Sequence, residues 1–384
     1  MSSAGVAFFI SVILLLYVWV FYPLFVGLAS FLIKNKKRIK NEELSYQLVS
    51  VVIAAHNEAK NLRQRVINIT DSSYPSDKIE IIIASDGSSD NTSEIINEMS
   101  NDFHNIKFID IHPQIGRAGV HNKAIENSDG DVVVFTDAET QFDDMFLCNI
   151  MSVFSDDKIG FASGVLKYRN INSGEVTKSV GLYWRAELWL RTMESNIGVY
   201  ILGSGACCAV RRLLYIDIPS TGDVDFTTPI DVVLQGYKCL HVSDAIAYDA
   251  LPDTPESEFR ARVRMTAKNI YGTIRRWGMM GAIMHPIYSI VLLSHKIGRW
   301  LTPFFMIIAI ISNLFLLTDD MLFVVFFGAQ FTFYALAFAG YLGLPVPYSG
   351  QAYSFLLANA AFFVGVILAL SGRVPKLYTP ASQM

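Results

Sequence analysis

The sequence has little charge, few cysteines and no excess of positive charge. Charged residues make up 17% of the 384 residues, against about a quarter in an ordinary soluble domain. Its four cysteines form no C-x-x-C pair, which fits a reduced compartment and argues against a disulfide scaffold or a cysteine zinc site. The net charge of −4 predicts no general attraction to nucleic acid.

Two glycine-rich phosphate-binding loops are also absent. The chain contains no G-x-x-x-x-G-K-S/T sequence and no G-x-G-x-x-G sequence. Those loops cradle the phosphates of ATP and of dinucleotides. Their absence argues against ATP hydrolysis and against NAD chemistry.

The apolar residues, 52% of the chain, gather at its two ends. Residues 5–33 carry no charge and are followed at once by the basic run KNKKRIK at 34–40. The uncharged run 5–33 is longer than the roughly 20 residues that span a bilayer. A secretory signal has a shorter apolar core, with its positive charges in front. We therefore predict a transmembrane anchor and basic flank over 1–40, with the flank in the cytoplasm; the alternative is a cleaved signal peptide.

Three further apolar runs near the C-terminus are each about one membrane span long. They predict about three transmembrane helices within residues 299–371, preceded by amphipathic interface helices over 256–298. The runs cover residues 300–317, 321–344 and 352–370.

The side of the C-terminus stays open at this point. An anchor and three spans place the tail, residues 372–384, outside the cell. However, Arg373 and Lys376 in that tail favour the inside. Either one segment is re-entrant, or residues 285–293 enter the membrane as well.

The middle of the chain, residues 45–255, alternates between short apolar runs and helical stretches. The runs are rich in β-branched residues and apolar on both faces, as in the strands of a covered parallel sheet. This repetition predicts an α/β domain with right-handed crossovers. Strands are predicted at 48–55, 79–85, 105–111 and 131–137, and helices at 59–70, 91–102 and 118–128.

Acidic residues follow three of these predicted strands, in AAHNEAKNL (54–62), SDGSSDNT (85–92) and TDAET (136–140). SDGSSDNT alone predicts no more than a turn and a helix cap. However, the carboxyl ends of parallel strands meet at one edge, where ligands bind. Like charges there repel unless a cation lies between them. A diphosphate ligand held through a divalent metal fits this pattern.

The order of motifs resembles the family-two glycosyltransferases, whose nucleotide-sugar-binding domain has the GT-A fold. The resemblance covers nearly the whole chain and is closest to membrane-anchored enzymes of exopolysaccharide or surface-glycan synthesis. It implies a mixed, mostly parallel sheet flanked by N-terminal and C-terminal transmembrane helices. The matching motifs are VVIAAHNEAKNL, SDGSSDNT, GRAGVHNKAI, FTDAET, YWRAELWLRTMESNIG, GSGACCAVRR, GDVDF, FRARVRM and LLSHKIGRWLTPFF.

The resemblance implies which residues hold the donor. Asp86 can accept a hydrogen bond from a base imide, which favours uridine. Arg117 takes the place of a Lys that commonly precedes A-L-N, and Asn122 matches the Asn of that motif. The nucleoside-binding positions are Ala55, Asn57, Glu58 and Asp86.

The resemblance also implies a metal site. Its D-x-D motif contacts ribose and phosphate and ligates Mg²⁺ or Mn²⁺. Asp137 and Glu139 occupy that motif here, with Glu in place of the second Asp. For His56 and His121 we favour packing or local hydrogen bonding, because no cluster of metal ligands surrounds them in the sequence.

The general base of inverting members is an Asp in a T-E-D-like motif, a position that GDVDF (222–226) fills. We assign the base to Asp225, with Asp223 as the alternate. Both residues would also suit the first turn of a helix. FRARVRM falls at the family's Q-x-x-R-W, so Arg264, helped by Arg262, would clamp the pyrophosphate.

The Q-x-x-R-W motif is incomplete, because Ala261 and Met265 replace its Gln and Trp. An acceptor platform of the cellulose-synthase kind is therefore in doubt. The surrounding basic segment also suits a helix lying on anionic lipid, with Arg260, Lys268, Arg275 and Arg276 toward the lipid. On the acceptor side, Trp184 and Glu187 are the candidates.

Together these features predict an inverting, metal-dependent, membrane-integral glycosyltransferase. Its donor is a nucleotide-sugar, with UDP favoured, and its acceptor is a glycan or a polyprenyl-linked lipid. We expect a multi-pass protein of the plasma membrane with a cytoplasmic catalytic domain and no nucleic-acid partner. A polysaccharide synthesis complex is a potential partner. The alternatives are a processive synthase with an export channel, and a catalytically degenerate nucleotide-binding subunit.

Overall fold

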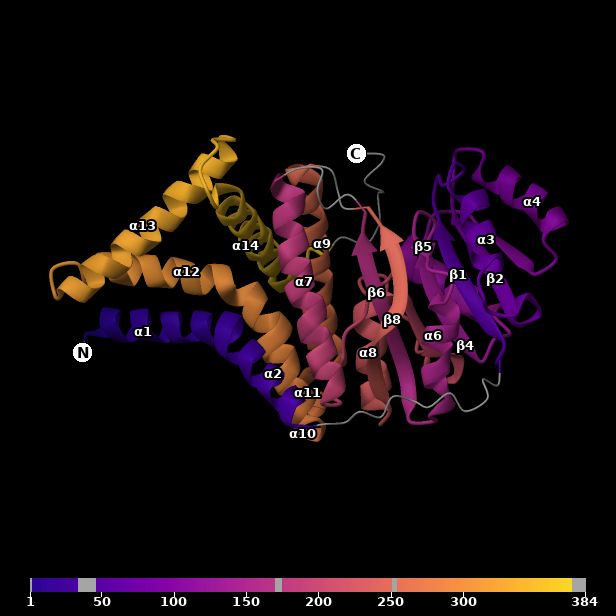
Figure 1. Cartoon of the computed structure of the whole chain (residues 1–384), viewed down its shortest axis with the longest axis horizontal. Helices are drawn as coiled ribbons and strands as arrows, with labels where there is room; N and C mark the ends of the chain where they lie inside the picture. The colour runs from indigo at the N-terminus through magenta and orange to yellow at the C-terminus, as the bar shows by residue number, and fades with distance from the viewer. Residues whose placement is uncertain (1, 34–45, 170–174, 251–253, 375–384) are drawn as a thin grey trace.

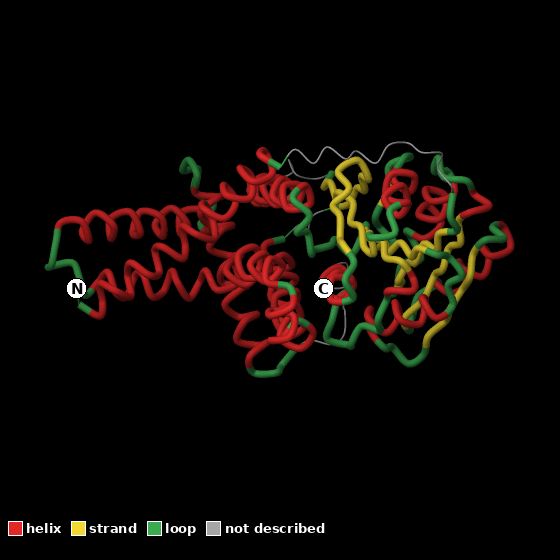
Figure 2. The backbone as a smooth tube through the Cα atoms, turned by 90° about the horizontal axis from the view of Figure 1, so that it is seen from below, coloured by secondary structure: helices red, strands yellow, loops and turns green. Residues whose placement is uncertain are grey.

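The computed structural model describes residues 2–33, 46–169, 175–250 and 254–374. An α/β domain forms one end of the molecule, and long apolar helices project from it with the N-terminus at their far end (Figures 1 and 2). The basic run 34–40 and Lys376, on which the predicted orientation depends, lie outside the described residues.

The domain is built on a mixed sheet of eight strands in the order β3-β2-β1-β4-β7-β6-β8-β5. Strands β1 to β4 are parallel to one another, whereas β7 is antiparallel to both of its neighbours, β4 and β6. The mixed, mostly parallel sheet is therefore confirmed. The strands are β1 (Val49–Ala55), β2 (Ile79–Asp86), β3 (Ile106–Ile111), β4 (Val132–Asp137), β5 (Gln141–Phe142), β6 (Ile159–Tyr168), β7 (Cys208–Arg211) and β8 (Lys238–Asp249).

Alternation along the strands sends side chains into two cores, one on each face of the sheet. In β1, Val51 and Ile53 enter the core beneath α3 (Leu62–Thr70), α4 (Thr92–Asp102) and α6 (Phe146–Ser152). Val52 enters the opposite core with α5 (Gly116–Glu126) and α8 (Val224–Leu234). As the edge strand, β3 has one neighbour, β2, and is less buried than the other strands, although its apolar residues pack against the cores on both faces.

Among the residues that the structure describes, four helices are long and apolar enough to cross a membrane. The first, Ser3–Leu32, comprises α1 (Ser3–Leu16), a π-helical turn (Tyr17–Phe21) and α2 (Tyr22–Leu32). The second, Pro286–Leu314, comprises α11 (Pro286–Val291), a π-helical turn (Leu292–Ile297) and α12 (Gly298–Leu314). The others are α13 (Met321–Tyr341) and α14 (Ser349–Leu370).

Residues 285–293, whose entry into the membrane the sequence left open, are continuous with the second of these helices from Pro286 onward. That helix crosses the predicted boundary at 298–299. Before it come α9 (Pro255–Arg276) and the short α10 (Gly278–Met284). Together with α7 (Glu175–Asn196), α9 stands between the sheet and the apolar helices (Figure 1).

The α/β domain and the apolar helices share one core. Trp300 of α12 and Phe362 of α14 belong to the same buried cluster as Phe226 of α8 and Val52 of β1. The α/β domain is therefore packed directly against the apolar helices.

Gly365 of α14 lies close against α9. A Cβ added there would lie 2.6 Å from the Thr266 Cβ, whereas one added to Gly328 of α13 would meet nothing within 4 Å. Alanine normally favours a helix over glycine by about 1 kcal/mol. We therefore expect Gly365→Ala to lower the Tm of the detergent-solubilised protein and Gly328→Ala to leave it equal or higher. Equal effects would contradict the observed packing.

Candidate active site

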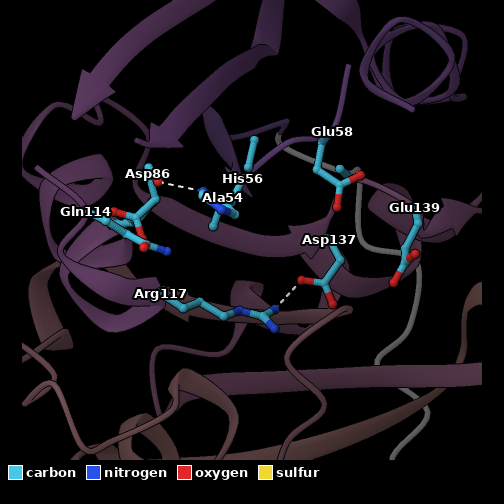
Figure 3. Close-up of a pocket in the computed structure, with 11 residues that line it drawn as sticks. Ala54, His56, Glu58, Asp86, Gln114, Arg117, Asp137 and Glu139 are labelled. Carbon is cyan, nitrogen blue, oxygen red and sulfur yellow. Dashed lines mark hydrogen bonds and ion pairs between the residues drawn. The ribbon is translucent and has the colours of Figure 1, made fainter. Parts of the chain in front are cut away.

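Two neighbouring pockets lie at the carboxyl ends of the strands: the first beyond β1, β2 and β4, and the second beyond β4, β6 and β8. The space that they enclose, open solvent included, is about 510 and 990 Å³. Arg117 and Asp137 line both pockets, so the two cavities meet at this pair. The first pocket (Figure 3) is lined by Ala54, Ala55, His56, Glu58, Asp86, Gln114, Arg117, Val120, Asp137, Ala138 and Glu139.

The loops after β1 and β2 are tied together by side chains rather than by a ligand. Asn57, with φ of 58°, accepts through its side-chain oxygen from the Ser89 amide at 2.8 Å. His56 Nδ1 lies 2.7 Å from the Asp86 carbonyl oxygen, which agrees with the local hydrogen bonding expected for this histidine. Asn57 does not line either pocket, so its part is to shape the loop.

Asp86 lies at the base of the first pocket and fixes the loop that leads into α5. Its two carboxylate oxygens accept from the amides of Ile115 at 2.7 Å and Gly116 at 2.9 Å. The carboxylate is buried and retains lone pairs on the pocket side. Holding this loop is a structural task of Asp86 that the sequence did not reveal.

Four carboxylates surround the point where the pockets meet: Glu58, Asp137, Glu139 and Asp249. Partial loss of hydration raises the pKa of Glu139 and of Glu58, and the charge of Asp137 adds to both. Burial and the charges of Asp137 and Glu139 raise the pKa of Asp249 to about 7. This concentration of like charge is balanced on one side by the guanidinium of Arg117, which is ion-paired with Asp137.

This donor set fits a hard divalent cation. Carboxylate oxygens are the ligands that Mg²⁺ and Mn²⁺ prefer, and a cation would relieve the repulsion among them. Within the described residues, no three His, Cys, Asp or Glu side chains are close enough to form a complete cage. A bound cation would therefore draw further ligands from a substrate or from water.

The second pocket lies between the sheet edge, α7 and α9. Asp225, the predicted base, lines it together with Trp184 and Arg264, as predicted for an acceptor and phosphate region. The full lining is Arg117, Asp137, Leu166, Tyr168, Trp184, Arg191, Gly203, Ser204, Gly205, Ala206, Asp223, Val224, Asp225, Asp249, Arg264, Met265, Lys268 and Asn269.

Asp225 begins the first turn of α8 and is half-buried. Burial and the neighbouring Asp223 raise the pKa of its carboxyl to about 6, against the opposing charges of Arg117 and Arg191. Such a value suits a general base that must be deprotonated near neutral pH. Gly203 and Gly205 let the chain pass close by, since a Cβ on Gly203 would lie 2.7 Å from the Asp225 carbonyl oxygen.

Two basic residues assigned to lipid are instead bound to the domain. Lys268 is 4% exposed, and its Nζ lies 3.0 Å from Asp223 Oδ1. Arg276 donates to Asp231 at 3.1 Å and to the Asp217 carbonyl at 2.6 Å. The sequence could not distinguish these two residues from lipid-facing ones. Both lie on a basic helix, and their partners in the domain are about 45 or more positions away.

Besides Asn57, three predicted site residues line neither pocket. Arg262 pairs with Glu258 at 2.5 Å and lies over the Tyr183 ring. Asn122 accepts from the Tyr215 hydroxyl at 2.7 Å and so braces the segment before α8. The third, Glu187, is buried beneath the second pocket among basic side chains. His121 is buried against Phe135, which agrees with packing.

The sequence missed three residues that the fold brings to the site: Arg191, Asp249 and Lys268. Asp249 ends β8, and the acidic end of a strand is the signal that would have found it. Arg191 lies four residues after Glu187 within the motif that was singled out for acceptor binding.

Comparison with known proteins agrees with this fold. Residues 50–218 match the family described as "Glycosyl transferase family 2". Residues 50–218 are therefore similar to family-two glycosyltransferases, and the fold is of the GT-A type, as the motifs predicted.

Individual relatives are more distant. The chain is 27% identical over 244 residues to the probable glycosyltransferase YdaM of Bacillus subtilis, covering 59% of this chain and 56% of that protein. It is 26% identical over 264 residues to the poly-β-1,6-N-acetyl-D-glucosamine synthase of Staphylococcus epidermidis, covering 64% and 63%. The matches thus span less than two thirds of these relatives.

Among solved structures, the chain resembles the mannosyltransferase PcManGT from Pyrobaculum calidifontis, which was solved in complex with GDP-Man and Mn²⁺. The TM-score is 0.74 at 18% identity, over 96% of this chain and 99% of that one. The likeness covers the apolar helices as well as the sheet and establishes the fold.

Proposed function

We propose that this chain is a membrane-integral, inverting glycosyltransferase. It moves a sugar from a nucleotide-sugar to a glycan or lipid-linked acceptor in polysaccharide or surface-glycan synthesis. The observation that carries the proposal is the meeting of the two pockets at Arg117 and Asp137, with Asp225 on the far side. The donor occupies the first pocket and the acceptor the second.

The chemistry follows from this placement. Asp225 takes the proton of an acceptor hydroxyl as its oxygen attacks the anomeric carbon. The bond from that carbon to the diphosphate oxygen breaks on the opposite face, so the anomeric configuration inverts. Arg117 and Arg264 lie in the second pocket, where guanidinium groups can pair with the departing diphosphate. A divalent cation held by Asp137 and Glu139 would neutralise its charge.

The membrane setting belongs to the same proposal. Four apolar helices and a shared core hold the pockets beside a bilayer, where a polyprenyl-linked acceptor or a growing chain can reach them. We place the catalytic domain in the cytoplasm at the plasma membrane, because nucleotide-sugars are made there.

A screen of UDP-, GDP- and TDP-sugars tests the function. Membranes containing the protein are incubated with each labelled donor, with and without EDTA. We expect metal-dependent incorporation from one nucleotide class. A UDP-sugar agrees with Asp86 as an acceptor for a base imide, and the GDP-Man held by PcManGT makes GDP-sugars the first competitor. If folded wild-type protein incorporates sugar from none of these donors, the proposal is overturned.

A processive synthase is the second candidate, because relatives include poly-β-1,6-N-acetyl-D-glucosamine synthases. The product separates the two candidates. A ladder of lengths from a single acceptor indicates polymerisation, whereas one added sugar excludes it.

The pH dependence tests the base. Asp225 acts when deprotonated, and its pKa of about 6 lies above the usual value, so kcat/KM is expected to fall as pH decreases through about 6. The charged groups facing it are Asp223, which is paired with Lys268, and Arg117 and Arg191. Rates measured from pH 5 to 8 with saturating metal would show this limb. A flat profile would contradict the assignment.

A further inference from the structure

A cluster of buried charges joins α7 to the helix Pro286–Leu314. We call it the junction cluster and define it as Glu187, Arg191, His295, Lys296 and Arg299. Glu187 is 2% exposed and Arg191 is 5% exposed. Ionised groups are expensive to bury, and a buried ion pair often adds little to stability over apolar residues of the same size. Packing of α7 against the membrane helix therefore does not by itself explain why the cluster is charged.

Glu187 is the centre of the cluster. Its carboxylate accepts from Arg299 Nη1 at 2.6 Å and Lys296 Nζ at 2.9 Å, and it lies 2.9 Å from His295 Nε2. From its own helix, Arg191 Nε donates to it at 3.0 Å. Burial alone would raise the pKa of Glu187, but His295, Lys296 and Arg191 hold that pKa well below its usual range. The carboxylate is thus anionic and is shared between the domain and the membrane helix.

The N-terminal helix joins the same junction. His295 Nδ1 lies 2.8 Å from Glu194 Oε1, and the Tyr22 hydroxyl donates to that oxygen at 2.6 Å. Close by, the two π-helical turns meet where the Tyr17 hydroxyl and the Ser294 hydroxyl lie 2.7 Å apart. Both long helices bend at these turns and run side by side (Figure 1). Their bend places His295 against α7.

Arg191 connects this junction to the second pocket. Its Nη1 donates to the Gly203 carbonyl at 3.0 Å, and its guanidinium lies 5.2 Å from the centre of the Trp184 ring. Gly203 in turn abuts the backbone of Asp225, closely enough that a Cβ would clash. Fixing the Gly203 carbonyl therefore fixes the wall against which Asp225 stands.

We propose that Arg191 is a positioning residue for Asp225 and the loop 203–206, and that the membrane helix Pro286–Leu314 holds Arg191 in place through Glu187. The inference rests on the proposed function for its kinetic consequences. Its structural part, the hold on the loop, stands apart from any transfer of sugar. On this view the membrane helices form part of the scaffold of the active site.

Arg191→Met tests the positioning role. Glu187 keeps His295 and the two cations Lys296 and Arg299 as partners in this variant, while the bond from Arg191 to Gly203 is lost. A small misplacement of reacting groups can cost about 100-fold in rate. We therefore expect kcat to fall about 10- to 100-fold, while the KM for the donor changes less than about twofold.

The pH profile is a further readout, which would not move if Arg191 were merely structural. The acid limb of kcat/KM shifts to higher pH, because the positive charge of Arg191 opposes protonation of Asp225. The conservative variant Arg191→Lys, which keeps the charge, leaves that limb in place.

Arg211→Met is the matched control. Arg211 also donates to backbone carbonyls, at 2.8 Å to Ile159 and 2.6 Å to Phe154, and it lies over the Phe154 ring. It lines neither pocket. Its loss is expected to lower the Tm without a selective fall in kcat or a shift of the acid limb. Equal kinetic effects in the two variants would overturn the proposal.

A double-mutant cycle of Arg191→Met and Arg299→Met tests the link to the membrane helix. Residues that act through one network give non-additive effects. We expect Arg299→Met to lower kcat severalfold, and the double variant to be no worse than Arg191→Met alone. Effects that simply multiply would remove the membrane helix from the proposal.

Hydrogen exchange separates failure of this inference from failure of the proposed function. Amide exchange of residues 203–208 is expected to accelerate in Arg191→Met and in Arg299→Met but not in Arg211→Met. This comparison needs no substrate, so it decides the structural hold even where no donor is turned over. Unchanged exchange in Arg191→Met would overturn the inference, whereas absence of transfer in the wild type overturns only the proposed function.

Discussion

Replacing Asp225 by Asn is expected to lower kcat about 10³-fold, within the range by which general bases accelerate reactions. The Asn side chain has nearly the same shape and remains in the second pocket, but it cannot take a proton from an acceptor hydroxyl. The donor pocket lies beyond Arg117 and Asp137, so binding of the nucleotide-sugar should stay within about threefold. The measurement pairs steady-state transfer with direct binding of the donor.

Stability distinguishes this loss from misfolding. The folded-state pKa of Asp225, about 6, exceeds the usual value of 3.8 for an aspartate. The folded protein therefore binds the proton more tightly than the unfolded chain, and stability falls as pH rises from about 4 to about 6. Above that range the full penalty remains, so the uncharged Asn variant should have an equal or higher Tm at neutral pH.

Asp223→Asn is the comparison that separates the two candidate bases. Asp223 is already ion-paired with Lys268 at 3.0 Å, so it is less available to take a proton. We expect its replacement to reduce kcat far less than Asp225→Asn. A larger loss in Asp223→Asn would transfer the role of base to Asp223.

The second large effect is expected at the metal site, where Glu139→Gln should abolish metal-dependent transfer. A neutral amide cannot replace an anionic oxygen ligand, and losing supporting groups alone can weaken metal binding by about 10- to 100-fold. Mn²⁺ affinity, measured by calorimetry or by electron paramagnetic resonance, should fall by at least that factor. This readout requires no substrate turnover.

Glu139→Asp is the matched control, since it restores the D-x-D pattern common in the family and shortens the side chain by one methylene. We expect it to bind Mn²⁺ and to transfer sugar within about tenfold of the wild type. If Glu139→Gln binds metal and transfers sugar normally, Glu139 is not a ligand.

The first half of the sheet could be predicted because its signals are local. The apolar runs around β1, β2 and β4 end in polar clusters, and the helices between them were placed within a few residues. The remaining strands could not be ordered from the pattern. β7 is a four-residue strand inserted antiparallel between β4 and β6, and no local pattern in the sequence specifies that pairing.

The residues of the site also divide into those with a local sequence signal and those without one. Asp137, Glu139 and Asp86 lie at strand ends, and Asp225 lies at the start of a helix, so each was visible from its own neighbourhood. Glu187 was placed on the acceptor side because it lies among aromatic residues. Its real partners, Lys296 and Arg299, are more than 100 positions away. Because Glu187 is buried among these distant opposite charges, it supports Arg191 instead of contacting a ligand.

The most direct measurement is the anomeric configuration of the transferred sugar. The purified protein is incubated with the donor selected by the screen, Mn²⁺ and an acceptor, and the new linkage is assigned by nuclear magnetic resonance. Direct attack by a hydroxyl deprotonated at Asp225 predicts a linkage of configuration opposite to that of the donor, formed by wild type and lost in Asp225→Asn. A linkage of retained configuration, or equal product from the Asp225→Asn variant, would contradict this mechanism.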